Sequence, residues 1–188
     1  AWEDGPFVKE EEFTRAVSLG LFDYLRKSRS GGFVVSLSGG ADSAVTACLC
    51  HLMVRLAVTD LGRAGFDAKL AHLPRLAEVP DGALVQTLLT CAYQGTAQSS
   101  DRTREAARTV AQVIGATFHD LDVDPIVNAY TSLIEDAIDR PLTWERDDIA
   151  LQNIQARTRA PSVWLLANLT GALLLATKLE ALALLGRQ

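Results

Sequence analysis

The chain has 188 residues, of which 48% are hydrophobic and 22% are charged, and its formal net charge is -5 at pH 7. This composition is that of an ordinary globular protein and excludes a disordered or fibrous chain. Because 18 Lys and Arg stand against 23 Asp and Glu, we expect no nucleic-acid partner. Three cysteines form no disulfide framework, which favours a reducing, cytoplasmic location.

No targeting or membrane segment is expected. The N-terminal residues Ala1-Trp2-Glu3-Asp4 contain neither a basic region nor an apolar run. The longest apolar stretches fall short of the roughly 20 residues that a membrane span needs. We therefore expect a soluble protein without a membrane partner.

Strand and helix patterns alternate along the chain. Apolar residues at helical spacing predict a helix over residues 10–27, and a nearly all-apolar run over 33–37 predicts a strand buried on both faces. Residues 62–82 contain Gly, Pro and mixed charge without a clear period and are expected to be loose. The other predicted helices cover residues 41–61, 102–114, 124–138 and 146–169 (with a break near Pro161), and the other strands 83–91, 117–121 and 172–176. This order predicts an α/β fold, a doubly wound, mostly parallel Rossmann-like sheet with helices on both faces.

The loop after the first strand, residues 38–43 (SGGADS), carries the strongest chemical signal. The first N–H groups of the following helix lack internal partners and lie at the positive end of its dipole, so they can bind an anion. Gly39 and Gly40 let the backbone approach a phosphate closely, and Ser38 and Ser43 add hydroxyl donors. The Asp42 carboxylate fits a ligand of Mg²⁺. The alternative is a turn that only caps the helix.

This loop resembles the pyrophosphate-binding loop, S-G-G-x-D-S, of the N-type ATP pyrophosphatase superfamily (adenine nucleotide alpha hydrolase-like fold). The Gly-Lys-Ser/Thr triplet of a Walker loop is absent. Members of the superfamily split ATP between the α and β phosphates to adenylate a substrate. The resemblance implies that ATP and Mg²⁺ are bound, with Asp42 as the metal ligand and the ATP phosphates held by Ser38, Gly39, Gly40, Ala41, Asp42 and Ser43.

A second motif lies on the predicted helix over residues 146–169. Asn153 and Arg157 are one turn apart and share a face, whereas Arg159 points elsewhere. An Asn and an Arg on one face could hold a ribose, a phosphate or a carboxylate. The alternative is a solvated polar helix face.

Together with a segment after the second strand, this motif narrows the resemblance. The string N-x-x-A-R-x-R, residues 93–96 (YQGT) and residues 99–104 (SSDRTR) look like the synthetase domain of NAD synthetases. The glutamine-dependent branch is the more similar one, including the entry segment over residues 2–7. The resemblance implies that Asn153 and Arg157 contact deamido-NAD and that Thr177, at the end of the last predicted strand, contacts ATP.

The resemblance also implies a reaction. The nicotinate carboxylate of deamido-NAD would be adenylated by ATP, and ammonia would then displace AMP to give NAD. No residue is assigned as an acid or base catalyst, because ammonia is already a nucleophile. We expect one synthetase domain over residues 1–188, incomplete after about residue 177, where Glu180 stands at the wrong offset for the family's Mg²⁺-binding Glu. Within these residues we expect no glutaminase domain of the kind that the glutamine-dependent branch carries.

Several alternatives stay open. The chain could belong to another N-type ATP pyrophosphatase, GMP synthetase-like or tRNA-modifying, or be a catalytically silent nucleotide-binding or dimerisation module. Apolar residues over 149–166 exceed what one small sheet needs, and NAD synthetases are dimers, so we expect a homodimer or higher homo-oligomer. Metal binding by Cys48 and Cys50 is not expected, because the side chains of residues two apart on a helix point about 200° away from each other.

Overall fold

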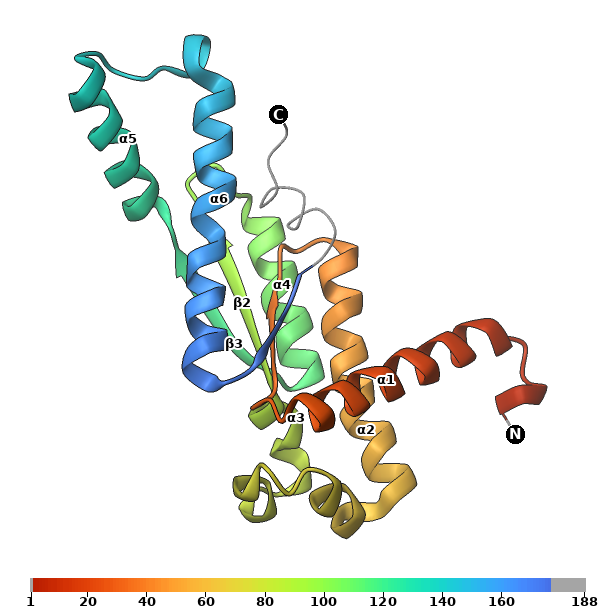
Figure 1. Ribbon diagram of the computed structural model, residues 1–188. Helices are drawn as coiled ribbons and strands as arrows, with labels where there is room; N and C mark the ends of the chain where they lie inside the picture. The colour runs from red at the N-terminus through yellow and green to blue at the C-terminus, as the bar shows by residue number, and fades with distance from the viewer. Residues whose placement is uncertain (1, 177–188) are drawn as a thin grey trace.

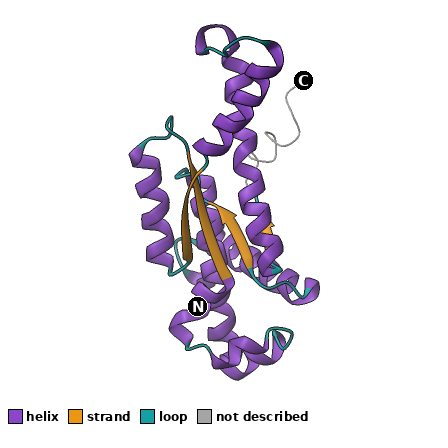
Figure 2. Ribbon diagram, turned by 90° about the vertical axis from the view of Figure 1, so that its left-hand side faces the viewer, coloured by secondary structure: helices purple, strands orange, loops and turns teal. Residues whose placement is uncertain are grey.

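The computed structural model describes residues 2–176. A four-stranded, all-parallel sheet has the strand order β3-β2-β1-β4, with helices on both faces (Figures 1 and 2). The α/β fold predicted from the sequence is therefore confirmed. The strands are β1 (Phe33–Ser36), β2 (Leu89–Gly95), β3 (Thr117–Asp122) and β4 (Leu173–Leu175). The helices are α1 (Val8–Ser28), α2 (Ala41–Lys69), α3 (Leu84–Leu88), α4 (Asp101–Ile114), α5 (Asp124–Ile138) and α6 (Trp144–Thr170), with short 3-10 turns at Trp2–Asp4, Pro74–Glu78 and Asp81–Ala83.

The strand β1 is buried at every position, as its apolar run predicts, and lies between β2 and β4. One face of the sheet packs against α2 and α4 in the main core, which includes Phe33 and Val35. The other face packs against α6 in a smaller core formed by Val34, Ala92, Val163 and Ala167. The chain therefore places its helices on one face while moving from β1 to β3, and on the other face when it returns to β4.

Helix ends follow the local chemistry of the sequence. The Ser100 hydroxyl accepts a hydrogen bond from the Thr103 N–H and caps α4, and Gly115, at φ 73°, ends this helix in the left-handed conformation. Pro125 stands in the first turn of α5, where its missing N–H costs nothing. The predicted helices over residues 102–114 and 124–138 are thus confirmed.

Two predicted boundaries are wrong. The strand expected over residues 83–91 begins only at Leu89, because Leu84–Leu88 form a helical turn whose apolar residues are equally buried. The loose segment expected from residue 62 is helical to Lys69. Gly62, at φ 66° and ψ 167°, interrupts α2 with a kink, after which the helix resumes.

Helix α6 also differs from expectation. Its non-helical residue is Asp147, and the helix continues through Pro161, where a break was expected. Val163, which the sequence placed on an apolar surface, is buried in the smaller core. Ile149, Trp164, Leu165 and Leu169 are exposed on α6, and Tyr130, Leu133 and Ile134 are exposed on α5.

Helix α2 is long and apolar enough to cross a membrane by length and composition, with a mean hydropathy of 1.5 in an 18-residue window. The sequence interpretation had found no such segment. The helix packs against α1 and the sheet and contributes Ala47, Cys50 and Met53 to the main core. Of that apolar window, 22% is buried inside the structure, so the core accounts for only part of its apolar content.

Candidate functional site

The loop between β1 and α2 is held by its own serines. The Ser38 and Ser43 hydroxyls lie 3.1 Å apart, and Ser43 Oγ accepts from the Ser38 N–H at 3.2 Å. The same Ser43 hydroxyl donates to the Gly40 carbonyl at 3.1 Å. Ser43 is buried, so its role in this loop is to fix the backbone, whereas Ser38 lines a cavity.

Gly39 brings two helix N-termini together. Its φ of 80° is the left-handed conformation, and a Cβ there would lie 2.3 Å from the Thr103 carbonyl oxygen in the first turn of α4. The starts of α2 and α4 therefore meet at the carboxyl edge of the sheet. Each provides unpaired backbone N–H groups and the positive end of a helix dipole, which is the arrangement that binds phosphate.

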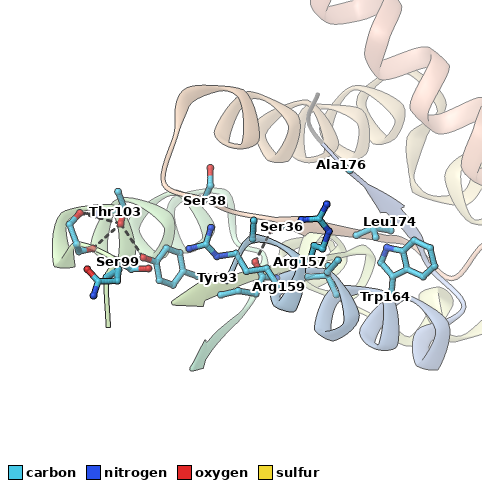
Figure 3. A pocket seen from close by; sticks show the side chains of 16 residues that line it. Ser36, Ser38, Tyr93, Ser99, Thr103, Arg157, Arg159, Trp164, Leu174 and Ala176 are labelled. Atoms are coloured by element: carbon cyan, nitrogen blue, oxygen red, sulfur yellow. Dashed lines mark hydrogen bonds between the residues drawn. The ribbon is translucent and has the colours of Figure 1, made fainter. Parts of the chain in front are cut away.

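A cavity of about 550 Å³ opens beside this loop, between the carboxyl ends of β1, β2 and β4 and helix α6 (Figure 3). This is the place where the chain changes its direction of winding about β1, and ligands of open parallel sheets bind at such a point. Its described lining contains two arginines, Arg157 and Arg159, and no carboxylate. The electrostatics thus favour an anionic ligand.

The cavity has a polar and an apolar part. Ser38, Ser99 and Thr103 stand on the side of the two helix N-termini, and Trp164 and Leu174 stand on the opposite side (Figure 3). Tyr93 also lines the cavity. Its hydroxyl is 3.0 Å from that of Thr103, and the Arg104 guanidinium lies 5.8 Å from its ring centroid. A ligand with a charged end and a flat apolar end would fit this division.

Asn153 and Arg157 share a face of α6, as predicted. Arg157 Nη1 donates to Asn153 Oδ1 at 2.8 Å. Arg157 lines the cavity, whereas Asn153 is not part of its described lining and reaches it through Arg157. The expectation that Arg159 points elsewhere is wrong, because its long side chain also lines the cavity and its Nε is buried without a hydrogen-bond partner among the described residues.

Asp42 lies exposed in the first turn of α2, outside the described cavity lining. Among the described residues, no group of three or more His, Cys, Asp or Glu side chains could hold a metal ion. A single exposed carboxylate at the end of this glycine-containing loop fits Mg²⁺, which is commonly bound by one or two carboxylates together with substrate phosphates. Thr177, expected to contact ATP, lies outside the described residues.

Three aspartates on β3 and at the start of α5 have structural roles, and the cysteines are thiols. Asp124 Oδ2 accepts from the Ala97 N–H at 2.6 Å, and Asp122 Oδ1 accepts from the Asp124 N–H at 3.0 Å, so both carboxylates fix the turn before α5. Asp120 pairs with Arg108 at 2.7 Å. All three cysteines are free thiols, and burial raises the pKa of both Cys50 and Cys91 to about 12.

Sequence reasoning assigned no role to Gln94 and Arg159, which both line the cavity. Gln94 lies near the carboxyl end of β2, and the strand had been placed too early for this residue to reach the edge of the sheet. A correct strand boundary would have identified it.

A parallel sheet with a glycine-containing loop at the end of its first strand, beside a cavity at the carboxyl edge, defines a Rossmann-like α/β domain of the nucleotide-binding kind. Residues 13–187 match the model of the NAD synthase family, and the chain belongs to this family. The chain is 36% identical over 173 residues to a glutamine-dependent NAD(+) synthetase of Oryza sativa subsp. indica, which covers 85% of this chain and 23% of the relative. It is 34% identical to the human enzyme of the same name, over 86% of this chain and 24% of the relative.

A solved structure agrees with these relatives. The crystal structure of a glutamine-dependent NAD(+) synthetase from Cytophaga hutchinsonii is 50% identical, with a TM-score of 0.79, over 88% of this chain and 30% of that one. The chain thus spans about a quarter of the length of the curated relatives it matches. The family match favours NAD synthetase over the GMP synthetase-like and tRNA-modifying alternatives.

Proposed function

We propose that this chain is the synthetase part of an NAD synthetase, an amide-forming ligase that uses ATP, deamido-NAD and ammonia. The observation that carries the proposal is the meeting of the loop over residues 38–43 with an arginine-lined cavity at the carboxyl edge of the sheet. The family match supports NAD as the product, because the relatives are named for NAD synthesis, and the three substrates are part of this proposal.

In the proposed reaction, a carboxylate oxygen of deamido-NAD attacks the α-phosphorus of ATP. The bond from this phosphorus to the bridging oxygen breaks, and pyrophosphate leaves with the bond electrons. Ammonia then attacks the carbonyl carbon of the acyl adenylate, loses a proton and displaces AMP. The product is the amide of NAD. No residue has to act as a nucleophile, since adenylation itself makes the leaving group.

The side chains and backbone of this chain would act by holding charge. The N–H groups at the starts of α2 and α4 and the Ser38 hydroxyl would bind the phosphates. Asp42 would hold Mg²⁺, which supplies charge neutralisation for the departing pyrophosphate. Arg157, oriented by Asn153, would bind an anionic group of deamido-NAD. Together these groups would place the carboxylate in line with the α-phosphorus.

The test is pyrophosphate release from ATP and Mg²⁺ with deamido-NAD, with and without ammonium. We expect release that requires deamido-NAD, NAD formation that requires ammonium, and loss of both in Asp42→Ala. Asp60→Ala is the matched control, because Asp60 is an exposed aspartate on the same helix, far from the loop in sequence. ATP binding without turnover in the wild-type chain would instead support a silent nucleotide-binding module.

We also propose that the protein assembles as a homodimer through α5 and α6. The side chains of Leu133, Ile134, Trp164 and Leu165 are large, apolar and exposed on these two helices, as is common at interfaces between subunits. Light scattering on the wild-type chain should give twice the monomer mass, and Leu165→Glu should give the monomer. A monomeric wild-type chain would contradict this proposal. A cytoplasmic location stays a prediction supported by the three free thiols.

A further inference from the structure

The floor of the cavity contains a buried polar pair in a row that is otherwise apolar. Side chains alternate along a strand, so Ser36 follows Val34 and Gln94 follows Ala92 on the face that packs against α6. Val34 and Ala92 belong to the smaller core, whereas Ser36 and Gln94, each 5% exposed, face the cavity. A buried glutamine at this point is costly unless its amide is hydrogen-bonded.

Within residues 2–176, only one end of this amide has a hydrogen-bond partner. Ser36 Oγ donates to Gln94 Oε1 at 2.7 Å, which fixes the oxygen toward β1. Gln94 Nε2 is buried and has no hydrogen-bond partner among the described residues. Arg159 Nε is a second buried donor without a partner there, and it lines the same cavity. Two donors without acceptors around one cavity indicate a ligand that brings acceptors.

The position of Gln94 indicates which acceptor this is. Anionic groups are attracted to the two helix N-termini on the polar side of the cavity and to Arg157, which lines it from α6. Val163 and Leu174 line the apolar side, on the same face of the sheet as Gln94. A planar heteroaromatic base fits against such apolar side chains with its edge toward the floor of the cavity. Its unprotonated ring nitrogens accept hydrogen bonds.

We propose that Gln94, oriented by Ser36, is a base-recognition residue whose free amide N–H donates a hydrogen bond to a ring nitrogen of the purine of ATP. The inference rests on the proposed function only in that ATP must enter this cavity. It adds a specificity-determining residue on β2 to the loop and arginines already described.

The test measures ATP binding by calorimetry on the full 188-residue chain, together with 1-deaza-, 3-deaza- and 7-deaza-ATP, each of which replaces one ring nitrogen with C–H. We expect one of the three analogues to bind about 5-fold to 10-fold more weakly than ATP, as the loss of one neutral hydrogen bond predicts. Gln94→Met should weaken ATP binding by a similar factor and abolish the difference between ATP and that analogue. Gln112→Met, at an exposed position on α4, should change neither.

Three results would overturn the inference. In the first, the analogue difference persists in Gln94→Met, as expected for a glutamine with a purely structural role. In the second, the variant removes discrimination against 2′-deoxy-ATP and leaves the deaza analogues unaffected, which assigns the donor to the ribose. In the third, the wild-type chain does not bind ATP, which overturns the proposed function as well.

Because Gln94→Met removes an acceptor of the Ser36 hydroxyl, thermal unfolding of each variant is recorded. The double variant Ser36→Ala/Gln94→Met lacks that hydroxyl, and the same binding measurements are repeated on it. Both variants should lose discrimination against the same analogue. Loss in one variant alone would contradict the inference.

Discussion

Arg157 donates a hydrogen bond to the side-chain oxygen of Asn153 one turn earlier on α6, at 2.8 Å, and thereby faces the cavity with a fixed guanidinium. Both side chains are exposed, so the bond adds little to stability and its effect is on orientation. A residue that orients an arginine should affect the binding of the anion that the arginine contacts.

We therefore expect Asn153→Ala to raise the KM for deamido-NAD several-fold, with a smaller change in the KM for ATP. Arg157→Lys keeps the charge but loses the planar fork, and should raise the KM for deamido-NAD about tenfold. Steady-state kinetics with each substrate varied in turn measures this. Gln152→Ala, an exposed neighbour on α6, is the control. Equal effects on both substrates would contradict the assignment.

Gly39→Ala should destabilise the fold and weaken ATP binding together. The added Cβ would lie 2.3 Å from the Thr103 carbonyl and require a φ of 80°, so α4 must move away from the loop. We expect a loss of about 2 kcal/mol or more in the free energy of unfolding by urea. Gly20→Ala, inside α1 with nothing within 4 Å, should be neutral or slightly stabilising. An unchanged midpoint for Gly39→Ala would show that the loop conformation is wrong.

The three cysteines should differ in reactivity. Cys50 and Cys91 are buried, and this burial raises the pKa of each thiol to about 12, whereas Cys48 is partly exposed. An Ellman assay on the native chain at pH 8 should show one fast thiol, and all three should react in denaturant. Cys48→Ser should remove the fast phase.

Since the folded-state pKa of both thiols is raised, the burial of Cys50 and Cys91 should also lower the stability of the fold as the pH rises above the usual thiol pKa of 9.0.

Asp147 should make the stability of the α5–α6 connection depend on pH. Arg140 Nη2 and Nη1 donate to its carboxylate at 2.8 and 2.9 Å and the Thr143 N–H at 3.0 Å, which holds the pKa of Asp147 well below its usual range. This stabilisation is present above the unfolded-state pKa of 3.8 and is lost as the pH falls through the lower folded-state pKa.

Asp147→Asn should therefore lower the Tm at pH 7, and the gap from wild type should narrow as the pH falls below about 4. Asp148→Asn, at the exposed neighbouring position, should leave the Tm close to wild type at each pH. Thermal unfolding followed by circular dichroism measures both. A gap that stays constant from pH 7 to pH 2 would contradict the role of this carboxylate.

The sequence predicted those parts of the fold whose signals are local. The apolar run of β1 and the predicted helix over residues 102–114, which Ser100 caps and Gly115 ends, depend on neighbouring residues alone. It did not predict the turn of helix at Leu84–Leu88, because a short buried apolar run has no period that separates helix from strand. The helical stretch after Gly62 is stabilised by contacts far along the chain, as Arg63 pairs with Asp81 and donates to the Val79 carbonyl.

The same distinction holds for the candidate site. The loop over residues 38–43 could be predicted because its chemistry is contiguous in sequence. The pairing of Ser36 with Gln94 could not, because it depends on which strands are neighbours and on their register, Ser36 standing opposite Ala92. Arg159 was misjudged because helical periodicity gives the direction of the Cα–Cβ bond and not the reach of a long side chain.

The return of the chain from β3 to the far side of β1 has a consequence for how ligand and fold support each other. The last described strand, β4, has three residues with only partly buried side chains, and Leu174 within it and Ala176 just after it line the cavity. A nucleotide that contacts β4, β1 and β2 at the same time would connect strands that are far apart in the sequence. Amide hydrogens of β4 should then exchange more slowly with deuterium when ATP is present, because the ligand becomes part of what holds this strand in place.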